Sequence, residues 1–233
     1  MSHHTNIVRI IGVYNALEEL KDSVVFVGGA TVSLYADKPE QADVRVTDDI
    51  DVLIEIGTYS EYATLQEKLM LLKFELDTDS KIICRYKYQG LIVDIMPTAE
   101  HILGFSNKWY RDGFANIMRY QADEYTQVNI FKPAYFLASK LEAFNSRGNN
   151  DGRTSHDFED IIFLLDNRQS IWEDLKNASN DVKRYLKIEF ERLIAMPFFE
   201  EWVTAHLEYN TSVIRGKKIM DALIELVSYD AIA

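Results

Sequence analysis

Val24-Val25-Phe26-Val27-Gly28-Gly29 is the stretch that decides the fold of the first half of this chain. Its four consecutive apolar residues, three of them β-branched, predict a short buried strand. The two glycines end the strand, and residues 30–35 then favour a short helix. A buried strand that turns through glycines into a helix is typical of a sheet with helices packed on it.

The sequence on both sides of this stretch continues the alternation of helix and strand. Apolar side chains at helical spacing predict an amphipathic helix over residues 7–20. Gln89-Gly90 is a hairpin signal, because it lies between two strand-like runs. The further predicted elements are strands over residues 49–56, 81–88, 91–95 and 127–131, and a helix over residues 60–72 with Ser60 as its N-cap.

The character of the sequence changes at Phe131-Lys132-Pro133. Beyond that point, the spacing of apolar residues predicts a series of helices, over residues 135–144, 155–165, 170–176, 181–195 and 198–207. We therefore expect an α+β protein with a mixed β-sheet core, and helices packed on it, in residues 1–132. A second, helical domain is expected over residues 133–233.

Composition limits the classes to which the chain can belong. Its 233 residues are 47% hydrophobic and 12% aromatic, which is typical of a globular protein. The apolar runs are too short to span a bilayer, and no hydrophobic signal segment follows Met1-Ser2-His3-His4. The single cysteine, Cys84, has no second thiol for an internal disulfide, which agrees with a reducing compartment. We expect a cytoplasmic protein without a membrane partner.

Three aspartates are the candidate catalytic residues. Asp49 and Asp51 are two positions apart on a predicted strand, so both side chains project from the same face. Asp94 lies in an otherwise apolar strand, where a lone charge is costly. Neighbouring carboxylates resist desolvation unless a cation joins them, and Mg²⁺ prefers such oxygens. We predict that these acids bind two Mg²⁺ ions, with Mn²⁺ as an alternative. A simple ion pair of Asp94 with Arg85 or Lys87 is the structural alternative.

Gly28 and Gly29 are predicted to bind phosphate. Because they have no side chains, their backbone N–H groups can approach a phosphate closely. The N-terminus of the following helix favours negative charge as well. The chain lacks the P-loop pattern, so this corner is the phosphate-binding turn that the sequence offers. A tight turn without a ligand is the structural alternative.

These motifs resemble those of the polymerase-β-like nucleotidyltransferase superfamily, whose members carry a Gly-Gly or Gly-Ser turn, an Asp-x-Asp pair and a third Asp on a later strand. Within it, the second half of the chain resembles the AbiEii-type nucleotidyltransferases, known as toxins of toxin–antitoxin and phage-defence systems. The resemblance covers roughly residues 22–168. The matching runs are Gly28-Gly29-Ala30, Arg45-Val46-Thr47-Asp48-Asp49-Ile50-Asp51, Val93-Asp94-Ile95, Lys140-Leu141-Glu142-Ala143-Phe144, Arg147 and Ser155-His156-Asp157-Phe158-Glu159-Asp160-Ile161.

The resemblance implies an enzyme that transfers a nucleoside monophosphate from a nucleoside triphosphate to a hydroxyl group and releases pyrophosphate. It also implies a helical domain that packs on the active site, and an antitoxin protein as a partner. The three acids match the metal-binding positions of the family. The residues for which the resemblance implies nucleotide binding are Gly28, Gly29, Arg45, Thr47, Lys140 and Asp157.

Lys140 and Asp157 also have structural interpretations. Lys140 fits a surface lysine on an amphipathic helix. Asp157 ends the run Thr154-Ser155-His156-Asp157, which is a variant capping box with Thr154 as the N-cap. In that case its carboxylate interacts with the helix dipole and not with a nucleotide.

The acceptor of the transfer stays open at this point. The formal net charge of −12 argues against strong non-specific binding to nucleic-acid phosphates, although a local basic patch is compatible with an RNA acceptor. Protein and small-molecule acceptors, the latter as in aminoglycoside nucleotidyltransferases, are the alternatives. A non-catalytic nucleotide-binding protein on the same fold is a further hypothesis. A glycosyltransferase ranks lower, because it needs neither Asp94 nor the glycine corner.

Overall fold

The computed structural model of the chain describes residues 2–41, 44–148 and 151–228. It is an α+β structure that divides into two compact units. The first unit contains the β-sheet and ends at Lys132, and the second begins at Pro133. The short segment Tyr35–Lys38 belongs to the second unit, although it lies early in the sequence.

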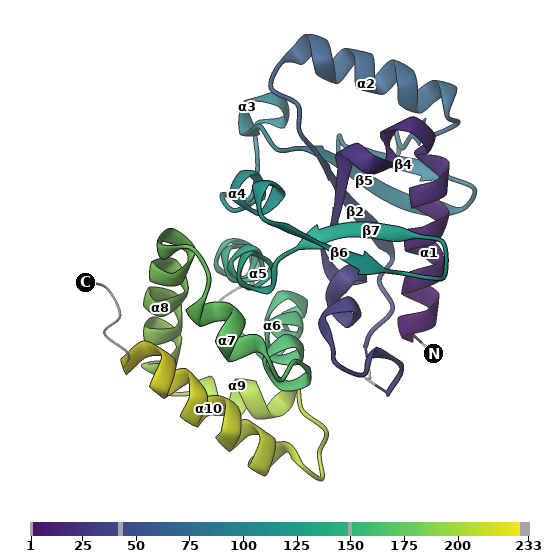
Figure 1. Cartoon of the computed structure of the whole chain (residues 1–233). Coiled ribbons are helices and arrows are strands. Elements are labelled where there is room, and N and C mark those ends of the chain that lie inside the picture. The colour runs from purple at the N-terminus through teal and green to yellow at the C-terminus, as the bar shows by residue number, and fades with distance from the viewer. Residues whose placement is uncertain (1, 42–43, 149–150, 229–233) are drawn as a thin grey trace. The chain divides into compact units, whose positions relative to one another are not determined.

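In the described residues, seven strands form one mixed sheet in the order β3-β4-β5-β2-β1-β7-β6 (Figure 1). The pairs β1–β2, β3–β4, β4–β5 and β6–β7 are antiparallel, whereas β2–β5 and β1–β7 are parallel. The strands are β1 (Val24–Val27), β2 (Asp49–Ile54), β3 (Glu75–Leu76), β4 (Arg85–Tyr88), β5 (Leu91–Pro97), β6 (Ile117–Gln121) and β7 (Gln127–Phe131).

The two faces of the central strands differ in chemistry. Ile50 pairs with Val93 across the parallel β2–β5 ladder, and both side chains are fully buried. Because side chains alternate along a strand, these residues share one face while Asp49 and Asp51 lie on the other. Burial of the apolar face fixes the register, since a slip of one residue would move the apolar side chains out of the core. The same register therefore determines where the acids lie.

Helix α1 (Ser2–Ala16) runs alongside this sheet (Figure 1). Its Ile10 and Val13 are fully buried, and Gly12 lies against Leu91, which shares a face with Val93. The predicted helix over residues 7–20 is wrong at both ends. The helix begins earlier, and a 3-10 helix, η1 (Glu18–Ser23), follows it because Glu18 adopts a positive φ of 45°.

The hairpin predicted at Gln89-Gly90 is confirmed. Strands β4 and β5 pair antiparallel with Tyr88 opposite Leu91, which leaves a two-residue turn. Both turn residues have positive φ, 47° and 83°, as a type I′ turn requires. The first strand is shorter than predicted, since it starts at Arg85.

The remaining elements of the first unit cover and connect the sheet. Two 3-10 helices, η2 (Gly29–Tyr35) and η3 (Pro39–Gln41), follow β1. The helices α2 (Tyr59–Leu71), α3 (Glu100–Leu103) and α4 (Tyr110–Ala115) lie between the later strands. The sequence did not predict α3, α4, β3 or β6, because these short elements carry few residues from which a period can be read.

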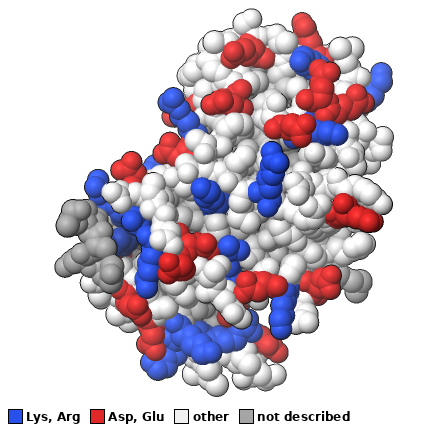
Figure 2. All heavy atoms as spheres, in the orientation of Figure 1, with Lys and Arg blue, Asp and Glu red and all other residues white. Residues whose placement is uncertain are grey.

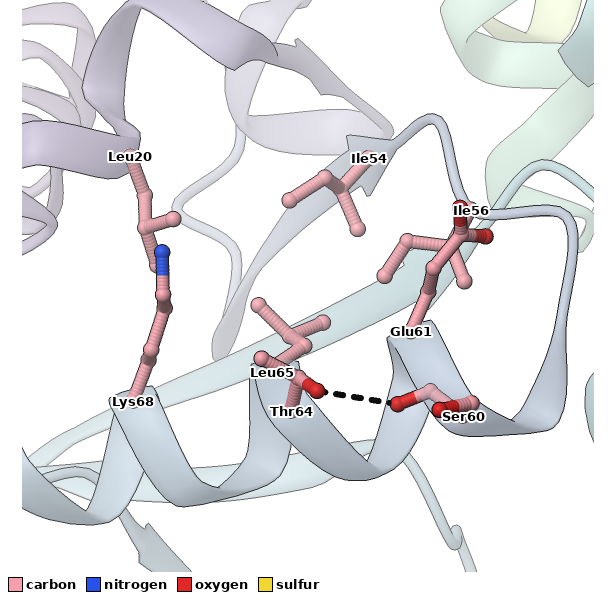
Figure 3. Close-up of a pocket in the computed structure, with 8 residues that line it drawn as sticks. All are labelled: Leu20, Ile54, Ile56, Ser60, Glu61, Thr64, Leu65 and Lys68. Carbon is pink, nitrogen blue, oxygen red and sulfur yellow. Dashed lines mark hydrogen bonds between the residues drawn. The ribbon is translucent and has the colours of Figure 1, made fainter.

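The N-cap of α2 is Thr58 and not Ser60, as predicted. The Thr58 hydroxyl accepts a hydrogen bond from the Glu61 backbone N–H, and the Glu61 carboxylate accepts one from the Thr58 N–H. Ser60 instead lies inside the first turn, where its carbonyl accepts a hydrogen bond from Thr64 (Figure 3). A threonine followed three residues later by a glutamate forms the reciprocal capping box, which Ser60 cannot form.

A small hollow of about 240 Å³ lies between α2 and the sheet. Figure 3 shows its apolar side chains, among them Ile54 from β2 and Leu65 from α2, with Lys68 at one end. Glu61 also lines it, but its carboxylate is engaged by the backbone N–H groups of Gly57 and Thr58. The Glu61 carboxylate thus belongs to the N-terminal cap of α2, and the other side chains around the hollow are mostly apolar.

The second unit is helical, as expected. Its buried centre contains Phe136, Phe158 and Trp202, and Phe158 packs edge-on to the Trp202 ring at a centroid distance of 5.9 Å. The Tyr35 ring packs in a tilted arrangement on that of Phe136, with a centroid distance of 4.5 Å, which ties the early segment to this unit. The helices are α5 (Pro133–Arg147), α6 (His156–Asn167), α7 (Ile171–Lys176), α8 (Asn180–Ile194), α9 (Phe199–Ala205) and α10 (Ser212–Ser228).

Two predictions in this unit are corrected. The N-cap of α6 is Ser155, whose hydroxyl accepts a hydrogen bond from the Phe158 N–H, and not Thr154. Asp157 consequently lies one position earlier in the helix than predicted. The sequence also did not predict α10, which follows the predicted helices.

In the described residues, no helix is both long and apolar enough to cross a membrane.

The capping box of α2 gives a direct stability prediction. We expect Thr58→Ala to lower the free energy of unfolding by about 1 kcal/mol, because the N–H of Glu61 loses its acceptor. The matched control is Ser60→Ala, an exposed position that is expected to change it by less than about 0.5 kcal/mol. Urea denaturation of both variants measures the difference. Equal losses in the two variants would contradict this assignment of the cap.

Candidate active site

The three predicted catalytic acids lie on one face of neighbouring strands. Asp51 on β2 pairs directly with Asp94 on β5 in the parallel ladder, and Asp49 lies two residues before Asp51. Paired residues of adjacent strands project from the same face, at a typical strand spacing of about 4.8 Å. Asp49 keeps 34% of its side chain exposed, whereas Asp94 keeps only 9%. The cluster is therefore open to solvent at Asp49 and closed at Asp94.

Arg85 on β4 bridges two of these acids. Its Nε and Nη2 donate to the two carboxylate oxygens of Asp94, both at 2.8 Å. The same Nη2 donates to Asp49 Oδ2 at 2.7 Å. Arg85 also pairs with Asp94 in the antiparallel β4–β5 ladder, so the backbone register places the guanidinium beside the carboxylate. One arginine thus supplies positive charge to a cluster of three acids.

Electrostatics around the cluster follow from this contact. Hydrogen bonds to Asp94, and the attraction of the neighbouring aspartates, hold the pKa of Arg85 above its ordinary value. Cys84, the preceding residue, is buried, and its burial together with the nearby Asp94 charge raises the pKa of its thiol to about 12. A thiol with such a pKa stays protonated at neutral pH, as is typical of an inert core cysteine.

The glycine corner lies directly against this cluster. Gly28 has a positive φ of 71°, which a residue with a side chain rarely adopts. A Cβ at Gly28 would lie 1.9 Å from Asp51 Oδ2, so only glycine allows the carboxylate to approach the backbone this closely. Gly29 begins η2, which is a 3-10 helix and not the α-helix that the phosphate-binding motif normally has.

Arg45 and Thr47 lie against Gly29. A Cβ at Gly29 would lie 2.6 Å from Arg45 Nη2 and 2.8 Å from Thr47 Cγ2. Helix α1 holds this segment in place, because Asn6 donates to the carbonyl of Arg45 and Arg9 donates to that of Thr47. The guanidinium of Arg45 is thereby placed beside the glycine corner, where positive charge favours an anion.

Lys140 and Asp157 lie in the second unit and contact each other. Lys140 Nζ lies 3.2 Å from Asp157 Oδ1 and 2.6 Å from Asp160 Oδ2. Arg147 donates to both oxygens of Asp157, at 2.7 and 2.9 Å. The Lys140 side chain is only 7% exposed, so it is not the surface lysine that an amphipathic helix would present. Lys140 has a structural role in joining α5 to α6.

The charge network changes the titration of Asp157. Burial alone would raise the pKa of its carboxyl, but the Arg147 and Lys140 charges outweigh burial and hold the pKa below its ordinary value. A folded-state pKa below the unfolded one stabilises the protein above the unfolded pKa, about 3.9 for aspartate. That stabilisation is lost as the pH falls through the folded-state pKa.

Two contributions to these clusters were missed in the sequence. The sequence suggests Arg85 as a partner of Asp94 alone, whereas the structure shows a second contact, with Asp49. The two-residue turn at Gln89-Gly90 indicates this position of Arg85, because a hairpin that turns there places residue 85 opposite residue 94. The contact between Asp160 and Lys140 was also missed, although Asp160 follows Asp157 by three positions, the spacing of neighbours on one helix face.

The donors present fit a divalent cation in their chemistry. Asp49, Asp51 and Asp94 supply carboxylate oxygens from one face of two adjacent strands, which is the donor type that Mg²⁺ prefers. The three carboxylates do not, however, surround a common point as the ligands of a metal ion do. In the part of the chain that the structure describes, no three His, Cys, Asp or Glu residues are grouped so as to hold a metal ion. Arg85 provides the positive charge between Asp49 and Asp94.

The close approach of Asp51 to Gly28 gives a second prediction. We expect Gly28→Ala to lower the free energy of unfolding by more than Gly90→Ala does. Gly90 has a similar φ of 83°, but no other atom lies within 4 Å of the place that a Cβ would take there, so its variant costs only the backbone term of about 1–2 kcal/mol. Urea denaturation compares the two variants. Equal destabilisation would show that Asp51 does not lie against the corner.

The buried network gives a third prediction. We expect Lys140→Met to lower the free energy of unfolding by about 3–5 kcal/mol, because it leaves two buried aspartates without their shared ammonium group. The control is Lys217→Met on α10, where the lysine pairs with Asp221 on the surface, and a change below about 0.5 kcal/mol is expected. Denaturant unfolding measures both. A loss at Lys140 as small as that at Lys217 would refute the buried network.

Two comparisons with known proteins identify no relative of this chain. A scan against protein-family models gives no match for this chain. A search of curated proteins gives no match either. The function is therefore argued from the carboxylate cluster, from Arg85 and from the glycine corner beside them.

Proposed function

We propose that this protein is a metal-dependent nucleotidyltransferase, which transfers a nucleoside monophosphate from a nucleoside triphosphate to a hydroxyl group of RNA or protein. The observation that carries the proposal is the pairing of Asp51 with Asp94 on adjacent parallel strands, with Gly28 directly against Asp51. Acidic side chains and a glycine corner meet at one place, although Asp51 and Asp94 are 43 positions apart in the sequence. Structural ion pairs do not require a glycine beside the carboxylate.

The charges of the cluster support this chemistry. Asp49, Asp51 and Asp94 together carry three negative charges, and Arg85 neutralises one of them. An excess of carboxylate on one open face is unfavourable unless further positive charge binds there. When bound, Mg²⁺ would supply that charge and offset the charge of the triphosphate oxygens.

The proposed reaction assigns a role to each group. The backbone at Gly28 and Gly29 and the guanidinium of Arg45 bind phosphate oxygens of the nucleotide. The acceptor hydroxyl oxygen attacks the α-phosphorus and forms the new P–O bond, while the bond to the leaving pyrophosphate breaks. Asp94 accepts the proton of the hydroxyl. Asp49 and Asp51 would hold the cation, with Asp94 as a third ligand.

The formal net charge of −12 gives no general attraction for a nucleic-acid acceptor. Figure 2 shows acidic and basic side chains interspersed over the visible face. Long-range attraction of a phosphate backbone therefore contributes little. Recognition of RNA or protein would rest on local contacts beside the active site. The roles of Lys140 and Asp157 in nucleotide binding, and an antitoxin partner, remain predictions from the family resemblance.

The test is incubation of the protein with each labelled nucleoside triphosphate, Mg²⁺ and total cellular RNA or protein. We expect label to enter one of the two macromolecule pools, and Asp51→Asn to reduce its entry by at least about 100-fold, because Asp51 holds the cation. The control variant is Asp48→Asn, which alters an exposed neighbouring acid and should leave incorporation unchanged. Thermal unfolding of both variants checks that they are folded.

Each result decides between specific alternatives. Incorporation that persists in the Asp51→Asn variant would contradict the proposed site. Label in neither pool, but in an added aminosugar, would replace the macromolecular acceptor with a small molecule. Nucleotide binding without any transfer would favour a non-catalytic binding protein.

A further inference from the structure

Arg85 contacts the same oxygen atoms that a cation would need. Its guanidinium donates to both oxygens of Asp94 and to Oδ2 of Asp49, with distances between 2.7 and 2.8 Å. Its side chain is only 18% exposed, so these contacts are partly shielded from water. Bidentate arginine–carboxylate contacts of this length are among the stronger hydrogen bonds in proteins. Arg85 therefore holds the two acids together.

A guanidinium and a divalent cation repel each other at contact distance. Both would have to lie between Asp49 and Asp94, in a partly buried site where the effective dielectric is well below that of water. The nearest other cation on β4 does not share this position. Lys87, two residues along the strand, instead contacts Asp77 at 2.7 Å and Asp79 at 3.3 Å. Arg85 is thus the residue of this strand that competes for the cluster.

We propose that Arg85 is a built-in counter-ion, which must release Asp49 and Asp94 before a divalent cation binds. In the metal-free protein it offsets the repulsion between the carboxylates and keeps the β2–β5–β4 ladder folded. When a cation enters, the guanidinium swings away from the carboxylates. Arg85 therefore weakens metal binding and makes occupancy of the site depend on cation concentration. The inference rests on the proposed function of this cluster.

This arrangement is consistent with the hairpin that carries Arg85. The residue is fixed by its backbone register opposite Asp94, but its guanidinium lies at the end of a long side chain with several rotatable bonds. Release of the carboxylates therefore needs a rotamer change and no movement of the strand. A lysine at the same place would keep the charge but lose the bidentate contact.

The test uses Mn²⁺ as the probe with the full chain. Free Mn²⁺ is titrated by electron paramagnetic resonance against the wild-type protein, Arg85→Gln and Lys87→Gln, and thermal unfolding is measured with and without Mn²⁺. We expect Arg85→Gln to bind Mn²⁺ at least about tenfold more tightly, since the guanidinium charge no longer competes for the carboxylates. It should unfold at a lower temperature than wild type without metal. Lys87→Gln should bind Mn²⁺ as the wild type does.

Two further variants keep the outcome decisive. Arg85→Lys retains the charge and is the substitute should Arg85→Gln not fold, with an intermediate Mn²⁺ affinity expected. Asp94→Asn should lose Mn²⁺ binding, which assigns the bound ion to this cluster. The counter-ion role would be overturned if the Arg85 variants bound Mn²⁺ no more tightly than the wild type while Asp94→Asn lost Mn²⁺ binding. That result would leave the proposed function intact. Absence of Mn²⁺ binding in all variants would reject the metal-dependent function together with this inference.

Discussion

The parallel pairing of β2 with β5 is the constraint on which the rest of the site depends. This ladder buries Ile50 against Val93 on one face, and the alternation of side chains then places Asp51 beside Asp94 on the other. A shift of one residue would move Ile50 and Val93 out of the face on which they are packed. Hydrophobic burial therefore fixes the position of the carboxylates, whose mutual repulsion alone would keep them apart.

Each unit handles its buried charges in a different way. In the first, one arginine faces three acids, which leaves an excess of negative charge at a site that is partly open to solvent. In the second, Lys140 and Arg147 balance Asp157 and Asp160. This balanced network, in which Lys140 and both aspartates are buried and Arg147 is exposed, joins α5 to α6. An excess of carboxylate at a partly open site favours the binding of a cation.

The glycine corner connects fold and proposed chemistry. The chain must leave β1 with a positive φ at Gly28, and the missing side chain lets Asp51 approach the backbone. Arg45 reaches the same corner because α1 holds its segment through Asn6 and Arg9. The phosphate site that we propose here would combine backbone N–H groups with one guanidinium, although η2 is a 3-10 helix and lacks a long helix dipole.

The sequence alone determined the strands that bury continuous apolar runs, the hairpin at Gln89-Gly90, the α+β class and the shared face of Asp49 and Asp51. These features depend on local periodicity and turn chemistry, which neighbouring residues encode. Only the tertiary structure decided the order of the strands, the pairing of Asp51 with Asp94 and the bridge from Arg85 to Asp49. It also decided that Lys140 is buried between aspartates. Contacts between residues far apart in the chain depend on which apolar faces pack together, and no local pattern records that choice.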